Sequence, residues 1–175
     1  MKDLEIIYEN VQKDITEKTV MMKFKIDITN VAPFMCSPFC EGWIWSEKIS
    51  DLNNYIFDLL IPEYLINVLY AYDSEQVEDK EYSFEESIGK YKESHYMENK
   101  DVAEKIDELI QLYNKYVGQD CSYLEFIKMI IKLERVLEIL EIDFEGICYV
   151  NPYEARFSNS LKTDKFDYNN LAKNF

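Results

Sequence analysis

The amino-acid sequence predicts an α+β fold in which a small antiparallel sheet packs against several helices. Short runs in the first third of the chain alternate apolar and polar residues, which is the pattern of strands with one buried face. Later runs repeat apolar residues every three or four positions, as amphipathic helices do. At 175 residues and 47% hydrophobic content, the chain is long and apolar enough to bury one core. We therefore expect a single globular domain covering residues 1–175.

The clearest strand pattern covers residues 20–28, where Met22, Phe24 and Ile26 alternate with charged residues. A β-type run at residues 4–8 is expected to pair antiparallel with it. Gly146 precedes a late run that could return to the sheet. The predicted strands are residues 4–8, 20–28, 43–47 and 147–151.

Residues 30–42 predict a loop, because Pro33, Pro38 and Gly42 interrupt any regular pattern. This loop and the residues after it are unusually rich in Phe, Met and Trp. Exposed aromatic clusters are uncommon on soluble monomers, so we expect these side chains to pack under the sheet.

Helices are predicted where apolar residues recur every three or four positions instead of every second one, and where capping residues occur. Ser50 is the expected N-cap of the first helix, which places Leu59 on its apolar side, and Pro62 should either break that helix or open the next one. Asp101 with Glu104, and Ser122 with Glu125, resemble capping boxes. Residues 87–99 give no clear assignment. The predicted helices are residues 50–60, 62–72, 101–117 and 122–142, and Gly118 is placed to end the third.

The segment of residues 73–86 divides the chain and is its strongest charge feature. It carries seven acidic residues and one base, Lys80, in a protein whose net charge is −15. Because it lies between the predicted second and third helices, we expect an acidic connecting segment.

The charge excludes several classes of partner. An acidic field repels phosphate backbones and anionic lipids, and the few Lys and Arg residues are dispersed, so direct nucleic-acid and membrane binding are not expected. There is no leader-like N-terminus and no apolar run long enough to span a bilayer, which predicts a cytoplasmic protein with reduced cysteines.

No residue pattern identifies a catalytic, cofactor or metal site, and we expect the protein not to be an enzyme. Cys36 and Cys40 form a C-x₃-C pair without a second close pair, and His95 is the one histidine. The acidic segment fails as an EF-hand calcium loop, because the required glycine and final glutamate fall on Glu78 and Phe84.

Acids interleaved with tyrosines suit a surface that binds Lys- and Arg-rich protein. Carboxylates accept paired hydrogen bonds from arginine, and tyrosine supplies rigid contact area. The alternative is a solvated acidic loop without a partner. The predicted partner-binding residues are Tyr72, Asp73, Glu75, Glu78, Asp79, Glu81, Tyr82, Glu85 and Glu86.

In size, acidity and lack of a catalytic motif, the chain is similar to bacterial immunity proteins that neutralise nuclease toxins. This predicts an inhibitor that covers the active or substrate-binding surface of a basic partner such as a nuclease toxin. One alternative is a nucleic-acid mimic that acts against host defence. Another is a small enzyme or ligand-binding domain that uses the Pro33–Trp45 segment as a pocket wall beside His95, Cys36 or Cys40.

Overall fold

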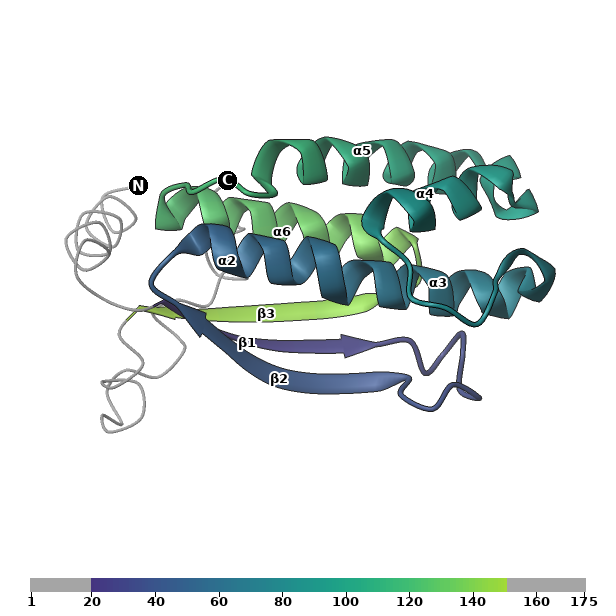
Figure 1. Cartoon of the computed structure of the whole chain (residues 1–175), viewed down its shortest axis with the longest axis horizontal. Coiled ribbons are helices and arrows are strands. Elements are labelled where there is room, and N and C mark those ends of the chain that lie inside the picture. The colour runs from purple at the N-terminus through teal and green to yellow at the C-terminus, as the bar shows by residue number, and fades with distance from the viewer. Residues whose placement is uncertain (1–19, 151–175) are drawn as a thin grey trace.

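The computed structural model describes residues 20–150 and shows a three-stranded antiparallel sheet with helices over one face (Figure 1). The strands are β1 (Val20–Asp27), β2 (Phe39–Ser46) and β3 (Asp143–Val150), in the order β2-β1-β3. The predicted α+β class is confirmed.

The alternation in β1 decides which face of the sheet is buried. Met22, Phe24 and Ile26 are at most 3% exposed beneath the helices, whereas Lys23 and Lys25 are half-buried on the opposite face. Both edges of β1 are paired, one with β2 and one with β3. It therefore has no free edge for the predicted pairing with residues 4–8, which lie outside the described residues.

Two strands begin four residues earlier than predicted. β2 starts at Phe39, so the end of the expected loop is strand, and β3 starts at Asp143. In β3 the buried Phe144 alternates with the acids Asp143 and Glu145, but the next position on the same face is Gly146, opposite Phe24, which interrupts the apolar pattern in the sequence.

The aromatic side chains of this region do not all pack as expected. Phe34, Phe39 and Trp43 are 59%, 45% and 47% exposed, so the prediction that they lie under the sheet is wrong. Met35 and Cys40 do pack partly against the core. The rings of Phe39 and Trp43 stay at the surface because these residues occupy alternate positions of β2 that face away from the helices.

The helices form two layers above the sheet (Figure 1). The layer nearest the sheet contains α2 (Ile49–Asn54), the π-helical turn η1 (Tyr55–Leu60), α3 (Ile61–Tyr72) and α6 (Tyr123–Ile139). The outer layer contains α4 (Phe84–Glu93) and α5 (Lys100–Tyr116). Two short 3₁₀ helices, η2 (Ser74–Gln76) and η3 (His95–Glu98), complete the described part.

Helix α6 is central to the core, as its wide apolar stripe predicts. It begins after Ser122, whose Oγ accepts from the Glu125 N–H at 3.2 Å, and it ends three residues before the predicted boundary. Its fully buried side chains include Tyr123, Phe126, Met129, Ile130, Leu133 and Leu137.

Two predicted helix starts need correction, whereas Pro62 opens the next helix, as one of its two expected outcomes. Helix α2 begins at Ile49, and the Ser50 N–H donates to Asp120 Oδ1 at 2.9 Å, so Ser50 is not the N-cap. Asn99, not Asp101, caps α5, because the Asn99 side chain accepts from the Asp101 N–H. The backbone stays helical from α2 through η1 into α3, where Pro62 lies in the first turn and needs no N–H partner. At the other end of α5, Gly118 follows with a φ of +69°, as expected of a helix-ending glycine.

The residue Gly42 makes room for the ring of Phe24. These two residues are opposite each other in β2 and β1, and a Cβ on Gly42 would lie 2.7 Å from Phe24 Cζ. Because Phe24 is buried, Gly42→Ala is expected to destabilise the fold by about 1–3 kcal/mol, measured by urea denaturation.

The matched control is Gly89→Ala in α4, where an added Cβ meets no atom within 4 Å. It should stabilise by about 0.4–1 kcal/mol, because alanine restricts the unfolded chain. Equal effects of the two substitutions would contradict the packing of Phe24 on Gly42.

Candidate functional site

The acidic segment leaves α3 at Tyr72, forms the short helix η2 and returns toward the side of α3, where Lys80–Tyr82 share a groove with Pro62 and Ile66. It is shorter than predicted as a connector. Residues 84–86 form the first turn of α4, so the connecting part is residues 73–83.

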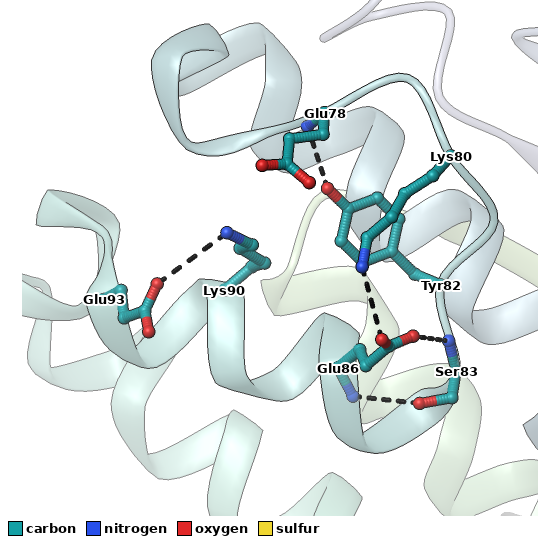
Figure 2. A network of polar contacts seen from close by, with 7 residues as sticks. All are labelled: Glu78, Lys80, Tyr82, Ser83, Glu86, Lys90 and Glu93. Carbon is teal, nitrogen blue, oxygen red and sulfur yellow. Dashed lines mark hydrogen bonds and ion pairs between the residues drawn. The ribbon is translucent and has the colours of Figure 1, made fainter.

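Glu86 serves to start α4 (Figure 2). Its carboxylate accepts from the Ser83 N–H at 2.9 Å, and its own N–H donates to Ser83 Oγ at 3.1 Å, which is a complete capping box. Lys80 Nζ lies 3.3 Å from Glu86 Oε1. The Ser83 N–H and then Lys80 lower the pKa of Glu86. This predicted binding residue therefore already has its partners within the chain.

Glu85 and Tyr82 also hold the segment in place. Tyr113 Oη in α5 donates to Glu85 Oε1 at 2.8 Å, and this bond raises the pKa of Tyr113 to about 12. Tyr82 Oη accepts from the Glu78 N–H at 2.8 Å, and Lys80 Nζ lies 4.8 Å from the centre of the Tyr82 ring (Figure 2). These contacts fix the backbone that carries the remaining acids.

Tyr72 lies at the other end of the segment, in a different cluster. Its ring stacks on Tyr96 with centroids 4.5 Å apart, and both hydroxyls donate to the Glu141 carboxylate. Burial, followed by the bond to Glu141, raises the pKa of Tyr72 to about 12. The structure thus separates Tyr72 from Tyr82 and Glu81.

Five of the predicted acids make no side-chain hydrogen bond or ion pair to another residue within 20–150. They are Asp73, Glu75, Glu78, Asp79 and Glu81. Asp73 is half-buried and the other four are exposed.

An open groove of about 450 Å³ lies where the segment returns beside α3. Its floor is apolar, formed by Leu59, Pro62 and Ile66, and Leu59 is 60% exposed. We call it the acidic groove, because three carboxylates stand among its lining residues. The complete lining is Asp58, Leu59, Pro62, Glu63, Ile66, Asn67, Lys80, Glu81 and Tyr82.

The groove contains residues that the sequence analysis missed. Leu59 was predicted to be buried, but it lies in the π-helical turn η1. A π turn holds more residues than an α turn, which rotates the following side chains away from the expected face. Asp58 and Glu63 carried no signal beyond being acids on a helix. Only Glu81 and Tyr82 of the predicted binding residues line the groove.

Asp58 lies in surroundings that disfavour its negative charge. Burial and then the charge of Glu85 raise the pKa of Asp58, so its ionised form is less favourable than in a free carboxyl group. Lys80 is the one base in the groove lining, and it is paired with Glu86. A second cation entering here would relieve the repulsion around Asp58.

This electrostatic strain makes Asp58→Asn an informative substitution. Because the pKa of Asp58 is raised in the folded state, its ionised form opposes folding above that pKa, and this cost disappears as the pH falls through it. The variant should be more stable than the parent at neutral pH, with the difference shrinking in acid. Urea denaturation across the pH range measures this.

Asp107→Asn, which removes the same charge from the exposed side of α5, is the control. If both variants gain the same stability, the gain reflects net charge and not the groove.

A second acidic hollow of about 670 Å³ lies between the end of the sheet and α6. Five carboxylates and Arg135 are in its lining, and Glu141 also binds the two stacked tyrosines. The acids are Asp27, Glu134, Glu138, Glu141 and Asp143.

His95 and the cysteines were the candidates for catalysis or metal binding. His95 is exposed, with Nδ1 3.0 Å from Glu98 Oε1, and this contact raises the pKa of His95. Cys36, Cys40 and Cys121 are free thiols. Within residues 20–150, no three His, Cys, Asp or Glu residues are arranged to hold a metal ion.

No protein family model, curated protein or solved structure matches this chain. Between residues 20 and 150, every helix is too short or too polar to cross a bilayer.

Proposed function

We propose that this protein is an inhibitor of a basic protein and binds it at the acidic groove, in the manner of an immunity protein that neutralises a nuclease toxin. The observation that carries the proposal is the pairing of an apolar floor with a carboxylate rim. Leu59, Pro62 and Ile66 lie beside Asp58, Glu63 and Glu81 in one open groove.

This arrangement suits the side chain of arginine or lysine. The aliphatic stem of such a residue can cover Leu59 and Ile66 while its charged head reaches the carboxylates of Glu63 and Glu81. A carboxylate also accepts two parallel bonds from a guanidinium group, which favours arginine. Tyr82 adds a half-buried aromatic ring at the same place.

The unpaired acids of the connecting part extend this field beyond the groove. Glu75, Glu78 and Asp79 are exposed, and within residues 20–150 their side chains form no ion pair, although the charge of Glu78 acts on Lys80. Such a field speeds the encounter with a cationic surface, and a nuclease that binds a phosphate backbone presents one. Covering that surface would exclude its substrate.

The test uses the reading frames beside this one in the source genome, expressed and purified singly. A basic neighbour should bind this protein in isothermal titration calorimetry, with affinity that falls steeply as salt is added, and should lose its activity in the complex. Competition by duplex DNA for the same site would indicate that the covered surface is a nucleic-acid groove. Binding that does not respond to salt, or that leaves the partner active, would contradict the proposal.

A further inference from the structure

Strand β2 is an edge of the described sheet. Its sequence, Phe39–Ser46, contains one charged residue, Glu41, and neither lysine nor proline. One side of β2 pairs with β1 over all eight residues, and no other strand of residues 20–150 pairs with its second side. Natural sheets commonly protect such an edge with lysine, proline or a bulge, because its free N–H and C=O groups can pair with another chain.

A hollow of about 300 Å³ lies at this edge, between β2 and α2. Leu52 and Tyr55 line it from the helical side, and Trp43 and Ile44 line it from the strand. Its two polar lining residues, Ser46 and Asp51, are hydrogen-bonded to each other. A strand added to β2 would direct every second side chain toward the helices. The hollow offers an apolar place for one such side chain.

The opposite face of β2 suits basic residues. Phe39, Glu41 and Trp43 alternate there, and all three are exposed. On the β1 side, Lys25 lies 5.7 Å from the Phe39 ring centre and Lys23 lies 5.5 Å from that of Trp43. Lysines of β1 therefore already lie beside both rings, and a strand added to the free edge of β2 could place further cations beside the same rings from the opposite side.

Charge decides between the possible occupants of this edge. Near β2 the charges nearly balance, because Lys23 lies 2.7 Å from Glu41 and Lys48 follows Glu47, but a second copy of this chain would bring a further net charge of −15. Like charges of this size oppose self-association. The edge therefore favours a cationic segment of another protein over a second copy.

We propose that β2 accepts an extended segment of a partner protein as an added strand, with apolar residues facing α2 alternating with lysine or arginine on the outer face. This surface is distinct from the acidic groove, and the proposal goes beyond the function proposed above. Main-chain hydrogen bonds supply the pairing, and the alternating side chains supply the selectivity.

The probe is a capped synthetic peptide of alternating lysine and valine, about eight residues long to match β2. Amide hydrogen exchange of the full chain is measured with and without it. We expect exchange within Phe39–Ser46 to slow by about tenfold or more at saturation. The fully N-methylated peptide keeps the charge but lacks backbone donors, and it should bind about tenfold more weakly or worse.

Two variants locate the effect. Trp43→Ala should weaken peptide binding several-fold, whereas Phe34→Ala, which removes another exposed aromatic ring, should not. Protection that appears at residues 58–82 in place of β2, absence of protection, or equal binding of the methylated peptide would overturn the proposal. Protection of β2 that persists after charge reversal in the groove would separate this surface from the one in the proposed function.

Discussion

Replacing Glu63 and Glu81 together with lysine is expected to weaken binding of the basic partner by about 100-fold or more. Each substitution replaces an attraction at the rim of the acidic groove by a repulsion, and close charge pairs at protein interfaces can couple by several kcal/mol. The fold should survive, because both side chains are exposed. Titration calorimetry at low salt measures the loss, and stopped-flow mixing should show a slower association.

The control carries the same change in net charge at another place. Glu104→Lys with Asp107→Lys alters the exposed side of α5, which does not line the groove. If this pair weakens binding as much as the groove pair, the whole field of the protein is responsible and the groove is wrongly assigned. Leu59→Ala tests the apolar floor in the same assay, with the exposed Ile139→Ala as its matched control.

Asn53→Asp is expected to destabilise the fold by about 3 kcal/mol or more at neutral pH. Asn53 is fully buried, and its Nδ2 donates to the carbonyl oxygens of Tyr116 and Gln119 at 3.2 Å each. These bonds tie α2 to the end of α5. An aspartate would lose both donors and place a carboxylate against two carbonyl oxygens.

The pH dependence distinguishes this mechanism from simple loss of packing. The buried carboxyl of the variant should have a raised pKa, so the loss is greatest above that pKa and becomes smaller as the pH falls through it. Urea denaturation at neutral and at acid pH measures the loss of stability with the new carboxyl ionised and with it protonated.

The neighbouring Asn54→Asp is the control, because Asn54 acts as an acceptor. Its Oδ1 receives the Gly118 N–H at 2.7 Å, and a carboxylate can do the same. A small effect at Asn54 and a large one at Asn53 are expected. Equal losses would show that the two asparagines do not differ as donor and acceptor.

Much of the helical framework could be predicted from local patterns. Helices α3, α5 and α6 have long apolar stripes, and Ser122 caps α6 as its spacing to Glu125 indicates. Helix α4 was missed although Ser83 and Glu86 show the same spacing. Both residues lie within the acidic segment, so Glu86 was interpreted as part of a binding surface and not as part of a helix start.

The acidic groove could be predicted only in part, because composition does not show which acids find partners within the fold. Glu85 and Glu86 bind Tyr113, Ser83 and Lys80, and these contacts depend on how α4 and α5 pack. Asp58 and Leu59 line the groove because they lie in the π-helical turn η1, and no local sequence pattern predicts such a turn. The sequence indicates that the surface is acidic, and the packing of the helices decides which residues line the groove.

The strand order β2-β1-β3 has a consequence for how the protein is made on the ribosome. The β1–β2 hairpin emerges early, but its second partner emerges only after α6. Until then, the edge of β1 that pairs with β3 is open, and such half-built sheets tend to aggregate. Because α6 and β3 are adjacent in the chain and contact each other, they can arrive together. Completion of the sheet is therefore a late event of synthesis, and a nascent chain that stops after α5 would leave the hairpin dependent on chaperones.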